Sequence, residues 1–165
     1  MSGVKTIPMT AVGAKKVQDE LHYLKTQARH KVIQAIKEAR ANGDLKENAD
    51  YHAAKEQQGF IEGRIVELEY QLSHCQVIDV SKFKNDGKVI FGSTVTLVNP
   101  DNNLQNAKTV TYQIVGDGEA DLKLGKISVS SPIARAIIGK FEGDIIDVSI
   151  PSGIVQYEIE KVEYI

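Results

Sequence analysis

The stretch Ala39-Arg40-Ala41-Asn42-Gly43-Asp44-Leu45-Lys46-Glu47-Asn48 separates two long segments that are rich in helix-forming residues. Gly43 predicts the end of the first helix, because glycine adopts the conformation that follows a helix C-terminus at little steric cost. Asp44 is a suitable N-cap for the next helix. The stretch therefore predicts the tip of a helical hairpin that carries two carboxylates, on Asp44 and Glu47.

Both flanking segments carry the apolar repeat of a coiled coil. No proline interrupts residues 10–42 or 44–74, and Thr10 is a candidate N-cap for the first helix. Apolar residues recur at spacings of 4, 3 and 4 in each segment, as in the seam between two packed helices. These residues are Val17, Leu21, Leu24 and Ala28 in the first segment and Ile61, Ile65, Leu68 and Leu72 in the second.

The two repeats also predict the position of the turn. Facing residues of an antiparallel hairpin have numbers with a constant sum, and pairing the two seams in reverse order gives 89 for every pair. The midpoint then lies between Asp44 and Leu45. The same register predicts that Lys31 faces Gln58 and that Ala35 faces Ala54, which would make the tip slim. The first helix would be about 48 Å long, so we expect the hairpin to project from the rest of the chain.

After residue 76 the apolar period falls to two, which predicts strands. Predicted strand residues are Val89, Phe91, Val95, Leu97, Val110, Tyr112, Ile114 and the segments 145–150 and 155–164, with turns at 85–87, 99–103, 116–118 and 151–153. Ser131-Pro132 predicts a short helix that ends near Ile138. We therefore expect an α+β protein, with a hairpin domain over 1–76, its acidic tip near 43–48, and a compact sheet domain over 77–165.

Composition is that of an ordinary globular protein: 165 residues, 42% hydrophobic, 25% charged and a net charge of −2. Residues 25–40 are locally basic, with Lys25, Arg29, Lys31, Lys37 and Arg40 against Glu38. This run predicts either a solvated helix face or a local positive field that steers a partner. The single cysteine, Cys75, and the absence of signal-peptide and membrane-spanning patterns lead us to expect a cytoplasmic protein.

The two tip acids have a structural explanation and a functional one. Asp at an N-cap followed by Glu three residues later approximates a capping box, and both acids suit the positive end of a helix dipole. On the residues alone this explanation carries more weight. The alternative is a pair of hard oxygen ligands for Mg²⁺, which a partner would have to complete because two carboxylates alone bind weakly. Arg40 and Lys55 flank the tip, as phosphate-binding groups or as solvated charges.

The sequence gives little support for a histidine or cysteine metal site, a phosphate-binding loop or a nucleophilic active site. His22, His30, His52 and His74 have no metal-ligand spacing, and His74-Cys75 at a helix end suits a structural role. No glycine-rich phosphate loop or nucleophile elbow is present. A self-contained enzyme is therefore not indicated.

Two long motifs resemble those of one family. The run from Glu38 through the tip to Glu62 is similar to the signature of bacterial Gre transcript-cleavage factors, in particular the GreA type. The run Ile127-Ser128-Val129-Ser130-Ser131-Pro132-Ile133-Ala134-Arg135-Ala136-Ile137-Ile138-Gly139-Lys140 resembles their C-terminal signature. The resemblance implies a coiled-coil hairpin followed by a domain similar to FK506-binding proteins.

The resemblance also implies a function. The C-terminal domain would dock on bacterial RNA polymerase at its secondary channel, and the hairpin would enter that channel. Asp44 and Glu47 would position a second Mg²⁺ and a water in the polymerase active site, where the backtracked nascent RNA is cut at its 3′ end. We expect Arg40, Lys55, Ser131 and Pro132 to contact polymerase or RNA, no membrane to be involved, and the free protein to be a monomer. Relatives often carry Arg in place of Lys55, and Lys cannot form a bidentate fork with phosphate.

Two rival functions stay open at this point. A regulatory or inhibitory Gre homologue would occupy the channel without promoting cleavage, although this chain has both acids. A binding module or prolyl isomerase would use the C-terminal fold, but fold does not determine function.

Overall fold

The computed structural model describes residues 5–44, 46–100 and 108–165, and the chain forms two compact units. One unit is built on Ala14–Cys75. The other combines Ile7–Gly13 with Gln76–Ile165. The α+β prediction, a helical hairpin followed by a sheet domain with one short helix, is confirmed. None of the helices in the described residues is both long and apolar enough to cross a membrane.

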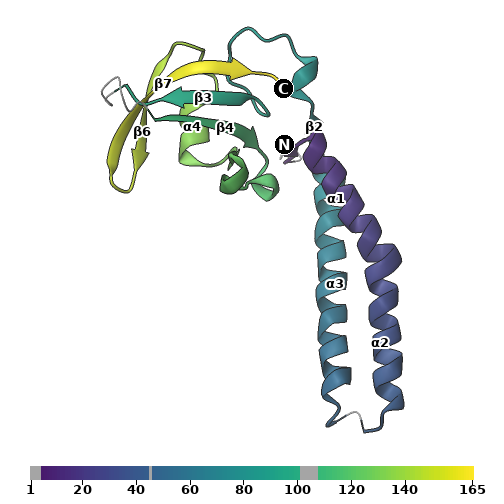
Figure 1. Cartoon of the computed structure of the whole chain (residues 1–165). Coiled ribbons are helices and arrows are strands. Elements are labelled where there is room, and N and C mark those ends of the chain that lie inside the picture. The colour runs from purple at the N-terminus through teal and green to yellow at the C-terminus, as the bar shows by residue number, and fades with distance from the viewer. Residues whose placement is uncertain (1–4, 45, 101–107) are drawn as a thin grey trace. The chain divides into compact units, whose positions relative to one another are not determined.

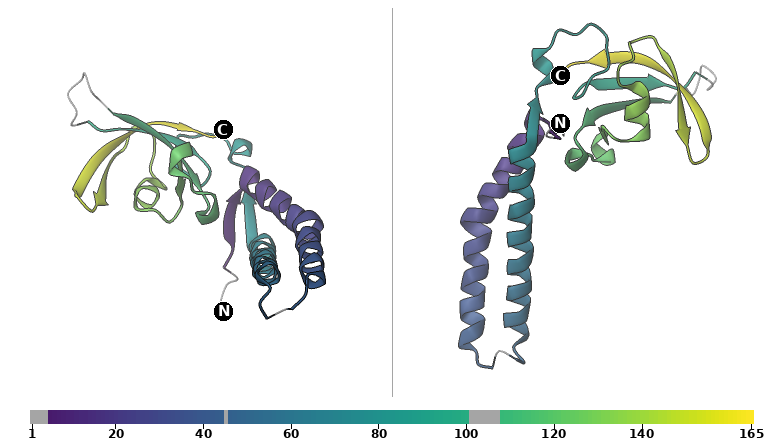
Figure 2. Two further views of the ribbon diagram at one scale, coloured as in Figure 1. Left: turned by 60° about the horizontal axis from the view of Figure 1, so that its bottom comes forward. Right: turned by 180° about the vertical axis from the view of Figure 1, so that it is seen from behind.

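The hairpin consists of two antiparallel helical segments that lie side by side (Figures 1 and 2). The first runs through α1 (Ala11–Tyr23), a π-helical turn η1 (Leu24–Ala28) and α2 (Arg29–Ala41), and the second is α3 (Ala49–His74). The backbone N–H of Gly13 donates to Thr10 Oγ1 over 3.0 Å, which confirms the predicted N-cap. Val32, Ile61 and Ile65 form the buried core of the hairpin, with Leu21, Leu24 and Ala28 packed against it.

The π turn η1 changes which residues of the first helical segment face α3. Beyond Ala28 the buried residues are Val32, Ile36 and Ala39, whereas Lys31 is exposed and Ala35 only half-buried. The predicted seam positions at Lys31 and Ala35 are therefore wrong by one residue, although Ala54 is buried as expected. The reason is that Arg29 N–H donates to Leu24 O, five residues back, so that η1 takes up one more residue than an α-helical turn.

Ion pairs flank this seam. Arg29 forms a two-pronged pair with Glu62, with N···O distances of 2.8 and 2.9 Å, and Arg64 forms another with Glu20, at 2.8 and 3.1 Å. Lys25 pairs with Glu69. The hydrogen bond from Arg29 lowers the pKa of the Glu62 carboxyl. Two cations of the basic run, Lys25 and Arg29, are thus already neutralised within the hairpin, which reduces the positive field expected there.

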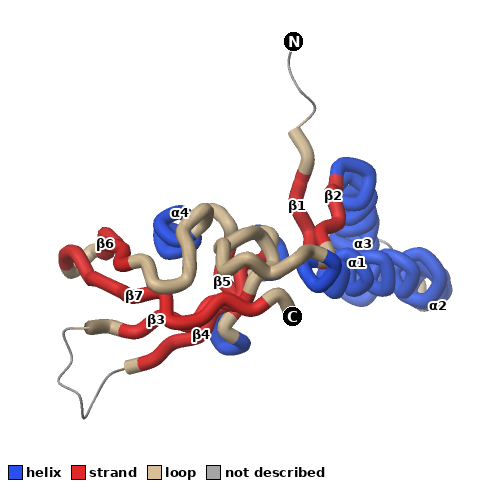
Figure 3. The backbone as a smooth tube through the Cα atoms, turned by 90° about the horizontal axis from the view of Figure 1, so that it is seen from above, coloured by secondary structure: helices blue, strands red, loops and turns tan. Residues whose placement is uncertain are grey.

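The second unit is a five-stranded sheet of order β5-β4-β3-β7-β6 with α4 against one face (Figure 3). All neighbouring strands are antiparallel except β4 and β5. The bounds are β3 Thr94–Val98, β4 Thr109–Val115, β5 Lys126–Ser128, α4 Pro132–Ile137, β6 Ile145–Ile150 and β7 Gly153–Glu163. Its core contains Val89, Val95, Leu97, Ile114, Ile127, Ala134, Ile137, Ile146, Val148, Ile159 and Val162.

Several elements differ from the predicted ones. The lead-in pairs as β1 (Ile7–Thr10) with β2 (Cys75–Ile78), a sheet too short to show a period in the sequence. Val89 and Phe91 precede a turn at Gly92, which has a φ of 86°, so they are not part of β3. The segment 116–118 enters a 3₁₀ turn, η3 (Asp117–Glu119), with further 3₁₀ turns at η2 (Val80–Lys82) and η4 (Leu122–Leu124). Of the turn predicted at 99–103, residues 101–103 lie outside the described residues.

Candidate functional site

The connection between α2 and α3 lies where the glycine and the register placed it. The backbone N–H of Asn42 donates to Ala39 O over 3.2 Å and ends α2. Gly43 follows with a φ of 120°, in the region that favours glycine. The next helix begins at Ala49. If Asp44 were its N-cap, the helix would begin at residue 45, so the loop between the helices is longer than predicted.

Asn48, and not Asp44, is the N-cap of α3. Its Oδ1 accepts a hydrogen bond from Tyr51 N–H over 3.0 Å. Asp44 instead accepts from Lys46 N–H over 3.0 Å, which forms a local Asx turn. Glu47 precedes the N-cap and so cannot complete a capping box. The predicted capping role of the two acids is therefore wrong, because Asn48 occupies the N-cap position and accepts from Tyr51 N–H.

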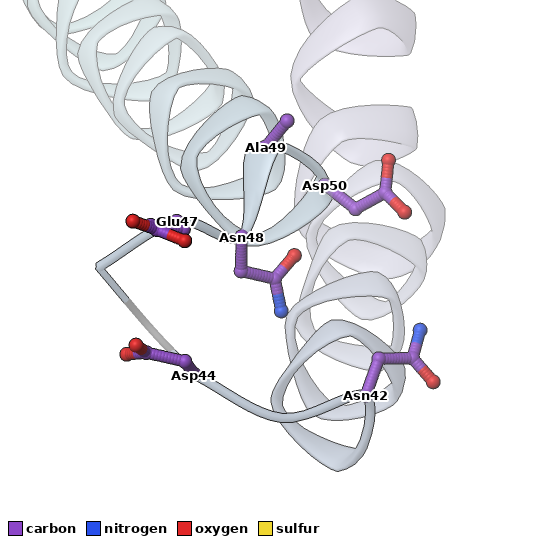
Figure 4. A pocket seen from close by; sticks show the side chains of 6 residues that line it. All are labelled: Asn42, Asp44, Glu47, Asn48, Ala49 and Asp50. Atoms are coloured by element: carbon purple, nitrogen blue, oxygen red, sulfur yellow. The ribbon is translucent and has the colours of Figure 1, made fainter.

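Both carboxylates are exposed at the tip. Figure 4 shows the side chains of Asp44 and Glu47 extending to the same side of the loop, while Asn42 and Asp50 point to the opposite side. All four line a shallow open hollow with Asn48 and Ala49. Glu47 forms no hydrogen bond or ion pair with another described residue. Asp44 and Glu47 are thus the pair of carboxylates that could act on one ligand, whereas Asn42 and Asp50 point away from them.

This donor set fits a shared magnesium ion. Carboxylate oxygens are the ligands that Mg²⁺ prefers, and one or two of them commonly suffice when a substrate or partner supplies the rest. Across residues 5–44, 46–100 and 108–165, no group of three or more His, Cys, Asp or Glu side chains is arranged to hold a metal. Asp44 and Glu47 could therefore hold such an ion only if another molecule supplied further ligands.

The predicted cations flank these acids. Arg40, in the last turn of α2, is exposed and lies over the Tyr51 ring, with its guanidinium carbon 5.7 Å from the ring centroid. Such a contact holds the flat guanidinium in place without using its hydrogen-bond donors. Lys55, on α3, donates to Gln58 Oε1 over 3.1 Å and is also exposed. Both charges are thus accessible to an anionic partner.

Ser131 and Pro132 belong to the second unit. Ser131 Oγ accepts from Ala134 N–H over 3.3 Å and caps α4, and exposed Pro132 follows at the first position of the helix. The predicted cap of this helix is confirmed. Roles for Asn48 and Tyr51 were not predicted, although Asn is among the strongest N-caps and stands directly before a continuous run of helix formers.

Comparisons with known proteins identify a family for this chain. Residues 7–77 match the family model "Transcription elongation factor, N-terminal", and residues 84–164 match "Transcription elongation factor, GreA/GreB, C-term". The chain is 58% identical over 158 residues to transcription elongation factor GreA of Nitrosococcus oceani, covering 96% of this chain and 98% of that protein. It is 55% identical over 162 residues to GreA of Haemophilus influenzae, covering 98% and 100%.

A solved GreA/GreB structure from Nitrosomonas europaea is 20% identical, with a TM-score of 0.42, and covers 97% of this chain and 99% of its own. The two family models together span most of the described chain, and the relatives are similar from end to end. The chain belongs to the GreA/GreB family of bacterial transcription elongation factors and is of the GreA type.

Proposed function

We propose that this elongation factor binds bacterial RNA polymerase, inserts its hairpin into the secondary channel and stimulates cleavage of backtracked nascent RNA. The polymerase is the enzyme, and the factor supplies Asp44 and Glu47 as additional ligands for a catalytic Mg²⁺. Removal of the displaced RNA 3′ end then lets elongation resume. The second unit docks on the polymerase, with Ser131 and Pro132 at the contact.

One observation carries this proposal: neither tip carboxylate caps a helix or forms an ion pair with a described residue, and both are exposed on one side of the loop. Asn48 caps α3 in their place, and Glu47 has no polar partner among the described residues. Two exposed carboxylates on one side of a loop repel each other, and the single local hydrogen bond from Lys46 N–H to Asp44 uses only one of their oxygens. A cation shared with a partner offsets that cost.

Each part of the tip has a distinct task in this proposal. The carboxylates of Asp44 and Glu47 supply two oxygen ligands, and the polymerase supplies the remaining ligands of the ion. When bound there, Mg²⁺ provides Lewis-acid stabilisation of the charge that develops on the phosphodiester during hydrolysis. Arg40, held over Tyr51, and Lys55 supply positive charge beside the RNA phosphates. The hairpin core is only two helices thick, which suits entry into a narrow channel.

Charge removal at constant shape tests the proposal. We expect Asp44→Asn and Glu47→Gln each to lower the rate of RNA cleavage in stalled, backtracked polymerase complexes by more than about 100-fold, because each removes a metal ligand. Asp44→Asn keeps an acceptor for Lys46 N–H, so the loop need not change. Polymerase affinity, measured by competition with labelled wild-type factor, should stay the same.

Asp50→Asn is the matched control. It removes a carboxylate from the same hollow, but that side chain points to the opposite side of the loop. We expect it to cleave as the wild type does. Normal cleavage by both Asp44→Asn and Glu47→Gln would disprove the proposed role. A wild type that binds polymerase but fails to stimulate cleavage would instead support a regulatory homologue.

A further inference from the structure

Asn48 connects the two helices at the tip through a single side chain. Its Nδ2 donates to Ala39 O, in the last turns of α2, over 2.6 Å, while its Oδ1 accepts from Tyr51 N–H, in the first turn of α3, over 3.0 Å. We propose that Asn48 is a positioning residue that holds the tip loop so that Asp44 and Glu47 present their carboxylates together. This inference rests on the proposed function of those acids.

The two bonds each engage a backbone group at a helix end: the Ala39 carbonyl at the end of α2 and the Tyr51 N–H at the start of α3. The last carbonyls of a helix and its first N–H groups have no partner within the helix. Ala39 is only 4% exposed, so its carbonyl has little access to water. It accepts from Asn42 N–H as well as from Asn48. Breaking the bond from Asn48 would leave this buried carbonyl with one weaker partner.

Only a short amide side chain can perform both tasks in this way. An amide presents a donor and an acceptor on the same group, whereas a carboxylate presents acceptors alone. Aspartate at position 48 would still cap α3 but would direct a second oxygen at the Ala39 carbonyl. Serine would also cap α3, but its shorter side chain would not span the distance to α2. Capping and bridging can therefore be separated by substitution.

The bridge closes the loop that carries the acids. Asn42 and Asn48 are both tied to Ala39 O, one through its backbone and one through its side chain. Between them, the Asp44 carboxylate is tied to Lys46 N–H. Glu47 directly precedes the bridging residue. The positions of both acids thus depend on the junction that Asn48 makes, while Asn48 itself points away from them (Figure 4).

The inferred role predicts an effect on metal use. Residues that orient metal ligands typically change metal affinity or activity by about 10–100-fold when they are mutated. We expect Asn48→Asp and Asn48→Ser in the full chain each to lower the cleavage rate at fixed Mg²⁺ by about tenfold and to raise the half-saturating Mg²⁺ concentration by a similar factor. Helical content by circular dichroism and polymerase affinity by competition should match those of the wild type, because both variants keep the cap.

Asn42→Asp is the matched control for the charge that Asn48→Asp introduces. It makes the same chemical change at the other end of the loop, where the side chain points away from the acids. We expect its Mg²⁺ dependence to match that of the wild type. Asn48→Ser provides the uncharged comparison, so agreement between the two Asn48 variants would assign the effect to the lost bridge.

The alternative results are distinct. If both Asn48 variants show the wild-type rate and Mg²⁺ dependence while Asp44→Asn is inactive, the positioning role is wrong and the proposed function stands. If their rates fall only in parallel with helical content or polymerase affinity, Asn48 is a structural cap and the inference is also wrong. If Asp44→Asn cleaves normally, the proposed function fails, and the positioning role fails with it.

Discussion

The two units of this protein differ in how their buried residues are supported. The sheet unit encloses a continuous core of eleven buried apolar residues between its strands and α4. The hairpin core has three buried residues in its main cluster, bordered by half-buried side chains and by ion pairs on the surface. The sheet unit thus derives its stability from its interior. The hairpin can be slim and can leave its tip free for function, at the cost of a smaller apolar core.

The largest effect on stability is expected in the sheet core. Ile159→Ala should lower the free energy of unfolding of the sheet unit by about 4 kcal/mol, because the cavity would be enclosed on all sides. Ile159 is fully buried, whereas Ile154 on the same strand is 74% exposed and provides the control. Hydrogen exchange read by mass spectrometry would report each unit separately. Similar losses for Ile159→Ala and Ile154→Ala would contradict this account of the core.

A smaller effect is expected from the same change in the hairpin. Ile65→Ala should cost about 2 kcal/mol, at the low end for such substitutions, because a two-helix core can partly close over the gap. Ile65 is 3% exposed, and the half-exposed Ile33 is its control. Exchange rates in α3 should rise while those in β3 and β7 stay unchanged. If Ile65→Ala destabilised the chain as much as Ile159→Ala, the contrast between the two units would not hold.

The hairpin ion pairs should add a modest dependence on pH. The pKa of Glu62 is lowered in the folded state from an ordinary value of 4.5. The Arg29–Glu62 pair therefore stabilises the fold fully above that value and ceases to do so as the pH falls through the lowered pKa. Between about pH 6 and pH 3, Glu62→Gln should lose less thermal stability than the wild type.

Glu56→Gln controls for the loss of a carboxylate on the same helix, since Glu56 forms no ion pair with any residue that the structure describes. It should follow the wild-type pH dependence. A Glu62→Gln variant that did the same would show that the pair contributes nothing to folding.

The smallest effects are expected at the tip itself. Asp44→Asn and Glu47→Gln should change the free energy of unfolding by less than about 0.5 kcal/mol, as exposed substitutions do. Asn48→Ala, which removes the N-cap, should cost about 1 kcal/mol. Urea titrations followed by circular dichroism would distinguish these values. A loss of about 1 kcal/mol in Asp44→Ala but not in Asn48→Ala would restore the capping explanation that the structure contradicts.

Most of the fold could be predicted from the sequence because the decisive signals are strong and local. The apolar repeat, Gly43 and Ser131-Pro132 each correspond to the structure. The register beyond Ala28 was missed, since one extra residue in a π turn leaves helix propensity unchanged and shifts only the phase. The cap of α3 was misassigned because Asp44 and Asn48 both suit an N-cap, and the choice between them depends on a contact with α2 that only the folded hairpin makes.

The π turn has a consequence for changing the length of the hairpin. η1 shifts the phase of the first helix. The residues of that helix beyond Ala28 therefore face α3 in register only when this turn is retained. Seven residues added to each strand between η1 and the tip would preserve the seam and lengthen the arm by about 10 Å. An insertion of two residues in one helix would instead turn the residues beyond it by about 200° and break the seam. The length of the hairpin can thus be changed in steps of seven residues per helix without loss of the seam.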